Sequence, residues 1–342
     1  MAVTLGTLAR QLGVDPSLVS RVLSGDPKAR VSEAKRAQIV ALAAASGYRP
    51  NRMARSLRTR RTRILAMLTP DITNPFHSLL FRGVEAAART AGYSVILCNT
   101  DDLAERFAQV VEVLAEGHVD GLLIATARSV DPAIEALQAS SLPYVLLNRR
   151  RDAGADAWIG PDDMKSGWLG VSHLARLGHR RIAVAVGDLS VGNMASRLAG
   201  YRAAMREFGL PVDETLVHSG SNERADGRAW MQQVLAMPAR QRPTAVLAMQ
   251  TLVSEGVMAA IYTGGLQVPR DISVVGYSGT LTPEITSICV PVDDIGRLAT
   301  EYLIERLDHP EAAQEPPLRQ TLPVLLVEAG STAKPRAAKR AD

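Results

Sequence analysis

The apolar positions follow two different patterns, and the change between them falls near residue 63. Residues 4–46 show only helical spacing, in three short pieces separated by Gly13 and by residues 24–27. Thr4 can cap the first piece, and Asp15 can cap the second, with Pro16 in its first turn. Ser32 opens the third piece. The sequence therefore predicts a small three-helix domain at the start of the chain.

From residue 64 onward, short apolar runs alternate with amphipathic stretches. The expected strands are 64–68, 94–98, 121–125, 144–147, 157–159, 182–186, 245–249 and 272–275. The expected helices are 79–91, 103–116, 132–138, 165–177, 197–208, 225–236, 253–263 and 295–307. Repeated alternation of strand and helix predicts doubly wound parallel sheets with helices on both faces. The length of this region favours two lobes over one sheet.

The composition is that of a globular protein without a disulfide framework. The 342 residues are 46% hydrophobic and 22% charged, and the two cysteines, Cys98 and Cys289, have no zinc-site spacing. We expect both cysteines to be small buried side chains. The first residues lack a signal-peptide pattern, and no apolar run is long enough to span a bilayer. We therefore expect a cytoplasmic protein without a membrane segment.

Charge is distributed unevenly along the chain. Residues 1–63 contain 13 lysines and arginines against three acidic residues, a charge of +10, so the remainder of a chain with net charge +4 carries −6. A basic domain joined to an acidic body is typical of a polyanion-binding protein, because lysines and arginines near phosphates release condensed counterions. A solvated charged face is the alternative interpretation.

The second predicted helix is a candidate for reading DNA. It is short and follows a glycine-containing turn, as in a helix-turn-helix motif. Its outward positions are Pro16, Ser17, Ser20 and Arg21. The planar guanidinium of Arg21 can bond the O6 and N7 atoms of guanine together, and Ser17 can reach a base or a phosphate.

Two groups of motifs occur in a fixed order along the chain. The first group is Val3-Thr4-Leu5, Ala9, Gly13-Val14, Val19-Ser20-Arg21-Val22-Leu23, Gly47-Tyr48, Pro50-Asn51 and Ala54-Arg55-Ser56-Leu57-Arg58. The second group is Asp71-Ile72-Thr73-Asn74-Pro75-Phe76, Val119-Asp120-Gly121-Leu122-Leu123, Leu177-Gly178-His179-Arg180-Arg181-Ile182-Ala183, Arg197-Leu198-Ala199-Gly200-Tyr201, Arg242-Pro243-Thr244-Ala245-Val246 and Val268-Pro269-Arg270-Asp271-Ile272-Ser273-Val274-Val275-Gly276-Tyr277. Together these motifs resemble the LacI/GalR family of bacterial transcription regulators. The resemblance implies a repressor that binds an inverted-repeat operator as a homodimer.

The resemblance also implies a division into domains. We expect a helix-turn-helix headpiece at 1–48, a hinge helix and linker at 49–63, and a ligand-binding and dimerisation core at 64–330. Within this core, which is similar to periplasmic binding proteins, the N-subdomain covers about 64–162 and 291–320. The C-subdomain covers about 163–290 and 321–330. We expect residues 331–342 to be a disordered tail, and without leucines there the chain has no tetramerisation heptad.

The family pattern assigns DNA contacts to the headpiece and the hinge. The residues are Thr4, Leu5, Pro16, Ser17, Ser20, Arg21, Asn51, Arg52, Ala54, Arg55, Leu57 and Arg58. Leu57, and with it Ala54, would enter the minor groove and bend the operator, while the hinge asparagine and arginines hold phosphates. The alternative for Leu57 is an ordinary core leucine.

Effector contacts are expected in loops that follow the carboxyl ends of strands. The candidates are Asp71, Phe76, His77, Asn193, Arg197, Met249, Gln250 and Ser278. Many sugar-responsive members carry Asn-Asp in place of Met249-Gln250, and Asp in place of Ser278. We therefore hypothesise a ligand less rich in hydroxyls than a hexose, such as an anion or aromatic acid held by Arg197, His77 and Gln250, with a sugar or sugar acid as the other ligand classes. Alternatively, Arg197 forms an ion pair and His77 lies on the rim without touching ligand.

Three rival functions are considered. An enzyme is disfavoured because the dinucleotide-binding, Walker, nucleophile-elbow and zinc-protease motifs are missing. An exported transport protein would need a signal peptide, and a protein that coats DNA without specificity would need no ligand cleft. We expect no cofactor and no metal, and we interpret His179 as structural. The sequence does not decide whether the effector releases DNA or promotes binding.

Overall fold

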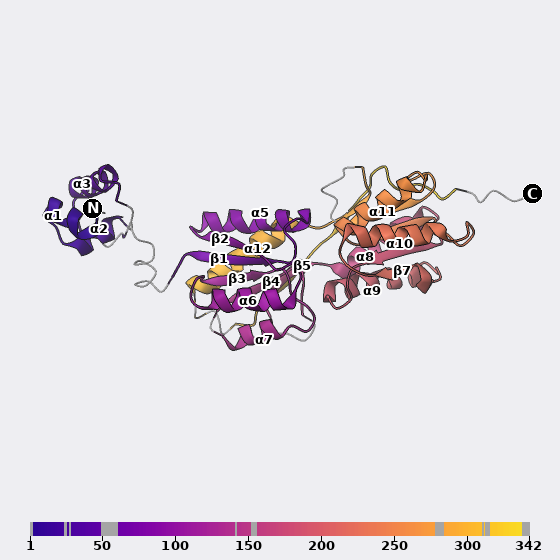
Figure 1. Cartoon of the computed structure of the whole chain (residues 1–342), viewed down its shortest axis with the longest axis horizontal. Coiled ribbons are helices and arrows are strands. Elements are labelled where there is room, and N and C mark those ends of the chain that lie inside the picture. The colour runs from indigo at the N-terminus through magenta and orange to yellow at the C-terminus, as the bar shows by residue number, and fades with distance from the viewer. Residues whose placement is uncertain are drawn as a thin grey trace, which may run out of the picture. The chain divides into compact units, whose positions relative to one another are not determined.

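The computed structural model describes residues 3–23, 26, 29–48, 61–140, 142–151, 156–277, 284–309, 311 and 315–336. The chain divides into two compact units, residues 1–62 and 63–342 (Figure 1). Most of the predicted hinge, with Asn51, Arg52, Ala54, Arg55, Leu57 and Arg58, lies outside the described residues. Ser278 also lies outside them.

The first unit contains the three predicted helices, α1 (Leu5–Leu12), α2 (Pro16–Leu23) and α3 (Glu33–Ala45). The predicted caps are present: the Thr4 hydroxyl accepts from the Thr7 amide, the Asp15 carboxylate from the Ser17 amide at 2.7 Å, and the Ser32 hydroxyl from the Lys35 amide at 3.3 Å. Gly13 ends α1 with φ +62°, a left-handed conformation that favours glycine. Buried side chains from all three helices, including Leu8, Val19 and Ile39, form the core. The predicted helix-turn-helix is confirmed.

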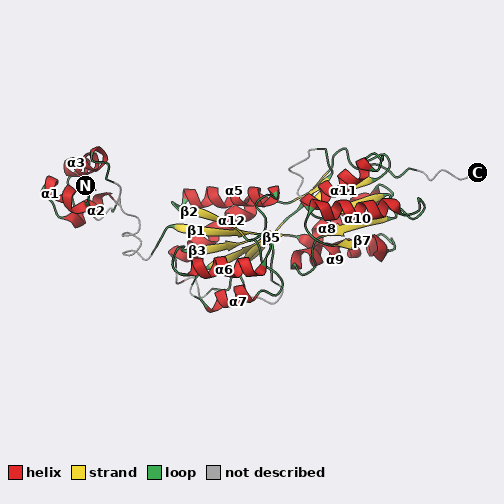
Figure 2. Ribbon diagram, in the orientation of Figure 1, coloured by secondary structure: helices red, strands yellow, loops and turns green. Residues whose placement is uncertain are grey.

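The second unit consists of two α/β lobes (Figure 2). The N lobe contains β1 (Ile64–Thr69), β2 (Ser94–Asn99), β3 (Gly121–Ile124), β4 (Tyr144–Leu147), β5 (Trp158–Pro161) and β11 (Arg319–Leu322), with helices α5 (Pro75–Thr90), α6 (Ala104–Ala115), α7 (Pro132–Ala139) and α12 (Val292–Asp308). Its sheet has the order β11-β5-β4-β3-β1-β2, and these strands pair in parallel. The predicted parallel sheet with helices packed on it is confirmed.

The C lobe repeats this architecture. It contains β6 (Ile182–Val186), β7 (Val217–Ser219), β8 (Ala245–Ala248), β9 (Ser273–Tyr277), β10 (Ser287–Cys289) and β12 (Leu325–Val327), with helices α8 (Asp163–Arg176), α9 (Gly192–Glu207), α10 (Arg224–Ala236) and α11 (Thr251–Thr263) and the 3₁₀ turn η1 (Glu214–Leu216). The sheet order is β12-β10-β9-β8-β6-β7. The pattern of apolar runs did not predict that β12 pairs antiparallel with β10.

The chain passes between the lobes where β5 leads into α8, where β10 leads into α12, and where β11 leads into β12. Strand β11 pairs with β5 as far as Leu322, so the N lobe extends past the expected boundary near residue 320. These connections place the carboxyl ends of β1, β3 and β4 in one lobe and those of β6, β8 and β9 in the other around one cavity.

Helices α8 and α9 approach closely enough to require glycine at their contact. A Cβ atom on Gly200 of α9 would overlap the carbonyl oxygen of Met164 in α8. A Cβ atom on Gly167 of α8 would likewise overlap the carbonyl oxygen of Arg197. This contact fixes α9, and with it the cavity residues Asn193 and Arg197, against α8.

The end of the chain corrects an expectation. Residues 331–342 are predicted to be disordered, but residues 331–336 are ordered on the C lobe. The Ser331 hydroxyl donates to the Val274 carbonyl at 2.6 Å, and the Val274 amide donates to the Ser331 carbonyl at 2.9 Å. Polar groups, rather than apolar side chains, hold this segment, so the hydrophobic pattern gives no sign of it. Residues 337–342 lie outside the described residues.

His179 has the structural role that the sequence indicates. Its ring is buried and lies within hydrogen-bond distance of the Thr244 hydroxyl, the Ser273 hydroxyl and the Ala333 carbonyl. Burial lowers the pKa of His179. The two cysteines, expected to be buried, are only partly buried, and burial raises the pKa of both thiols. In the part of the chain that the structure describes, no helix is both long and apolar enough to cross a membrane.

Candidate functional site

A cavity of about 450 Å³ lies between the two lobes of the second unit. Its walls are the loops that follow the strands, together with the first turns of α5 and α9. Six of the eight predicted effector residues line it: Asp71, Phe76, His77, Asn193, Arg197 and Gln250. The rule that ligands bind beyond the carboxyl ends of parallel strands therefore located one common cavity. A volume of this size suits a small metabolite.

Met249 does not belong to the cavity in the way that was expected. Its side chain is fully buried in the apolar core of the C lobe, and only its carbonyl oxygen takes part in the site, by accepting from Arg197 Nη1 at 2.6 Å. Met249 is the last apolar position of a buried run, so its side chain follows the strand pattern into the core. Its assignment as an effector-binding side chain is corrected accordingly.

Arg197 lines the cavity from the C lobe. It is 1% exposed, and its Nε donates to Asp163 Oδ1 at 2.7 Å. Its guanidinium lies over the Tyr277 ring, 3.7 Å from the centroid. The ion-pair alternative for Arg197 is therefore present, although the partner lies inside the C lobe. Burial raises the pKa of Asp163, and Arg197 acts in the opposite direction.

His77 is neutral, which changes the chemistry expected of it. The ring is buried and packs edge-on against Phe76, with centroids 5.3 Å apart. Burial, assisted by the nearby Arg149 charge, lowers its pKa to about 3. Near neutral pH the ring therefore brings no positive charge to an anion and can offer it only a hydrogen bond. His77 is also not a rim residue, since it lies within the wall.

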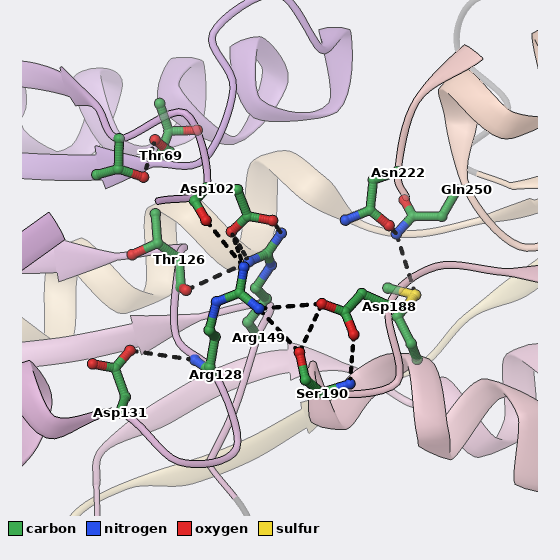
Figure 3. A network of polar contacts seen from close by, with 12 residues as sticks. Thr69, Asp102, Thr126, Arg128, Asp131, Arg149, Asp188, Ser190, Asn222 and Gln250 are labelled. Atoms are coloured by element: carbon green, nitrogen blue, oxygen red, sulfur yellow. Dashed lines mark hydrogen bonds and ion pairs between the residues drawn. The ribbon is translucent and has the colours of Figure 1, made fainter. Parts of the chain in front are cut away.

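Figure 3 shows a network of ion pairs that sequence reasoning missed. Its residues line the same cavity as His77. Arg149 donates from Nη1 to Asp102 Oδ1 at 2.6 Å and from Nη2 to Asp102 Oδ2 at 3.1 Å. Arg128 extends the network from Asp102 to Asp188. Burial would raise the pKa of Asp102, but its bonds to Arg149 and the Arg128 charge hold it below the usual range. Each of these residues follows a strand end, so the rule that nominated Asp71 could have found them.

Three residues that line the cavity carry buried polar atoms without hydrogen-bond partners within the described ranges. The Asn193 amide is fully buried, and neither its nitrogen nor its oxygen has a hydrogen-bond partner among the described residues. The same holds for His77 Nδ1 and Asn148 Oδ1. A buried polar group without a partner is costly, so these atoms indicate a ligand or ordered water that both donates and accepts hydrogen bonds.

The cavity carries more negative than positive side chains. Its described acidic residues are Asp71, Asp101, Asp102, Asp188 and Glu223, and its arginines are Arg128, Arg149 and Arg197. Each of these arginines already pairs with a carboxylate, and His77 adds no charge. An anionic effector would therefore meet an unfavourable field, whereas a neutral ligand would not.

In the first unit, the candidate DNA contacts lie along α2 and at the start of α1. Pro16 and Ser17 are exposed, and Ser20 and Arg21 are partly exposed, while Val19 and Val22 are buried. Thr4 is exposed and Leu5 is partly buried. The Ser17 hydrogen bonds lower the pKa of Asp15, and the Arg21 charge adds to this effect. Helix α2 thus presents a polar face with one arginine, as a recognition helix requires.

Comparisons with known proteins agree over most of the chain. Residues 62–322 match the family described as periplasmic binding proteins and sugar binding domain of LacI family. The ribose operon repressor of Escherichia coli (strain K12) is 36% identical over 334 residues, covering 96% of this chain and 99% of that protein.

Two solved structures are similar over long stretches. The lac repressor dimer bound to operator and the anti-inducer ONPF has a TM-score of 0.84 and 27% identity, and the match covers 97% of this chain and all of that one. A LacI family transcriptional regulator from Enterococcus faecium with bound ribose has a TM-score of 0.70 and 27% identity, and covers 80% of this chain and all of that one. The chain belongs to the LacI family of ligand-responsive, DNA-binding transcriptional regulators.

Proposed function

We propose that this regulator represses transcription by binding an inverted-repeat operator as a homodimer, and that its cavity binds a neutral, hydroxyl-rich molecule of about the size of a monosaccharide. The observation that carries the effector class is the set of buried, unpartnered polar atoms on both lobes, at Asn193, His77 and Asn148. Hydroxyl groups both donate and accept, so one polyol can satisfy all of them. The protein acts as a sensor and not as an enzyme, in keeping with relatives that are repressors.

Ribose is the first molecule to test, because a similar repressor is named for the ribose operon and a similar structure holds ribose. The anion and aromatic-acid hypothesis is the second candidate class, with Arg197 and Gln250 as its remaining supports. The paired state of Arg197 and the excess of carboxylates count against it.

Thermal shift and calorimetry of the full chain with D-ribose, D-ribonate and benzoate separate the two classes. We expect D-ribose to stabilise the protein and the two acids to leave it unchanged, because a ligand that binds only the folded state raises its melting temperature. Stabilisation by benzoate or ribonate alone would overturn the proposed effector class. Asn193→Leu should abolish the ribose effect, and Gln233→Leu, an exposed position on α10, should retain it.

The role in DNA binding is tested by selecting duplexes from a random pool with the full chain. We expect an inverted repeat to be enriched and its affinity to change when D-ribose is added, since effector and operator binding are coupled reciprocally. Enrichment of single half-sites without symmetry would contradict the dimer.

A further inference from the structure

The side chain of Arg128 joins the two lobes beside the cavity, and a second hydrogen bond between the lobes runs from Arg150 Nη2 to the Ser196 hydroxyl at 3.0 Å. Arg128, in the loop after β3 of the N lobe, donates from Nη1 to Asp188 Oδ2 at 3.2 Å and to the Ser190 hydroxyl at 3.0 Å. Asp188 and Ser190 lie in the loop after β6 of the C lobe. Figure 3 shows these bonds of Arg128. The Ser129 amide also donates to the Ser190 carbonyl at 3.1 Å, so a backbone hydrogen bond joins the lobes as well.

The N lobe holds the guanidinium of Arg128 in position. Nη2 donates to the carbonyl oxygen of Asp102 at 3.0 Å, and the Asp102 carboxylate lies 3.5 Å from the same nitrogen. The backbone amide of Arg128 donates to Asp131 Oδ2 at 3.4 Å. Arg149 in turn fixes Asp102 through two hydrogen bonds. Arg128 therefore loses little side-chain freedom when it reaches the C lobe.

The acceptor on the C lobe, the Asp188 carboxylate, is also held in position by hydrogen bonds. The Ser190 amide donates to Asp188 Oδ1 at 2.9 Å, and the Ser190 hydroxyl donates to Asp188 Oδ2 at 2.7 Å. Burial acts to raise the pKa of Asp188, but the Ser190 hydrogen bonds and the Arg128 charge outweigh it and lower the pKa. The carboxylate is therefore ionised when it meets the guanidinium, which makes the contact a charge-assisted hydrogen bond.

We propose that Arg128 is a latch that stabilises the closed arrangement of the lobes before any effector arrives. The contact exists only while the lobes are together, so its whole free energy favours the closed state and raises the apparent affinity for an effector that binds that state. The cavity wall and the latch share Asp102 and Arg149, so an effector that contacts either residue also acts on Arg128. This inference rests on the proposed effector site.

An ordinary surface ion pair would contribute little, because solvent screens it. Arg128 is 29% exposed and Asp188 is 44% exposed, so salt should weaken their attraction. What distinguishes this pair is that its ends lie on different lobes and that each end is positioned by further bonds. Salt should therefore open the lobes without unfolding either of them.

Hydrogen exchange of the full chain without effector tests the latch. The reporter is the Ser129 amide, whose acceptor lies on the other lobe, and the reference is the set of amides in β1. We expect Arg128→Met and Asp188→Asn each to speed exchange at Ser129 by about fivefold and to leave β1 unchanged. Raising NaCl from about 0.05 to about 1 M should do the same in the unmodified protein and have no further effect in Arg128→Met.

The matched control is Arg202→Met, which removes an exposed ion pair with Glu214 inside the C lobe. It should leave Ser129 exchange as it is. The double variant Arg128→Met with Asp188→Asn should exchange no faster than Arg128→Met alone, because that single change already removes the contacts to both Asp188 and Ser190. If Arg128→Met also speeds amide exchange in β1, the test rests on Ser129 exchange in Asp188→Asn alone.

Ser129 exchange equal to that of Arg202→Met, or additive effects in the double variant, would overturn the latch. No effector is present in this experiment, so either result leaves the proposed function as it was. Conversely, failure of D-ribose to bind would refute the proposed effector without changing the exchange result.

Discussion

At the scale of single residues, burial decides the charge of the cavity more than sequence position does. His77 and Asp102 both line the cavity, yet burial makes the imidazole neutral while Arg149 keeps the carboxylate ionised. The sequence placed His77 correctly, because it follows the first predicted strand. It could not give the charge of His77, which depends first on the burial of the ring and then on Arg149, a residue far away in the chain.

The neutral state of His77 makes stability depend on pH. Its pKa is about 3 in the folded protein and about 6.5 in the unfolded chain, so the unfolded chain takes up the proton first as the pH falls. Stability is therefore lost between about pH 6.5 and pH 3, by about 2 kcal/mol at pH 5. The measurement is urea unfolding at several pH values.

His77→Gln is the comparison for this pH dependence. In this variant, the part of the pH dependence of the unfolding free energy that comes from His77 below pH 6.5 should disappear. The charges that act on His77 from Asp71 and Asp102 are present in both proteins, so their own contributions should be the same. Equal slopes in the two proteins would show that the pKa of His77 in the folded protein is the same as in the unfolded chain.

At the scale of helices and strands, continuously buried strands were predictable and short, partly exposed ones were not. The runs that became β1, β6 and β8 are continuous and apolar, and the structure buries them. Strands β7, β10, β11 and β12 have three or four residues each and include half-exposed or exposed positions. Such short segments show no measurable period, and only their neighbours in the sheet define them as strands.

Helix α2 supplies a prediction for DNA recognition. Arg21 is its arginine on the polar face, and Arg21→Ala should relax base preference at one operator position and weaken binding by about 1–3 kcal/mol. The measurement is fluorescence anisotropy on the selected operator and on its single-base variants. The control is Arg10→Ala, which replaces an exposed arginine in the last turn of α1. It should weaken binding to all DNA sequences alike. Equal losses on specific and random DNA for Arg21→Ala would contradict the assignment.

The contact between α8 and α9 supplies a second prediction. Gly200→Ala should destabilise the C lobe strongly, because the new methyl group meets the backbone of Met164, which cannot move aside cheaply. Its melting temperature should fall clearly below that of Gly330→Ala, whose nearest neighbour is the Glu284 carbonyl at 3.8 Å. Indistinguishable melting curves would mean that the helices can separate without loss.

At the scale of the whole molecule, dimer formation should bury apolar surface that a single chain exposes. Strand β2 lies at the end of the N-lobe sheet and exposes Ile96 and Leu97, at 43% and 39%. An apolar edge strand of this kind is a ready surface for association with a second copy. The sequence predicted a dimer only through the family resemblance, since Ile96 and Leu97 read as part of an ordinary buried run.

Ile96→Glu should therefore weaken the dimer. Sedimentation velocity should show more monomer than in the unmodified protein, and operator affinity should fall with it, because two headpieces act together only when the chains are paired. Val113→Glu, on α6 and 56% exposed, is the matched control and should leave the dimer intact. A full dimer in the Ile96 variant would place the interface elsewhere.

The ordered end of the chain bears on how the protein can be engineered. Residues 331–336 supply partners to the Val274 carbonyl, the Thr286 amide and the His179 ring, all in the interior of the C lobe. Truncation after Gly330 would strip these groups of their partners in one step, whereas a reporter domain fused beyond Arg336 would leave them untouched. The carboxyl terminus thus tolerates addition far better than removal.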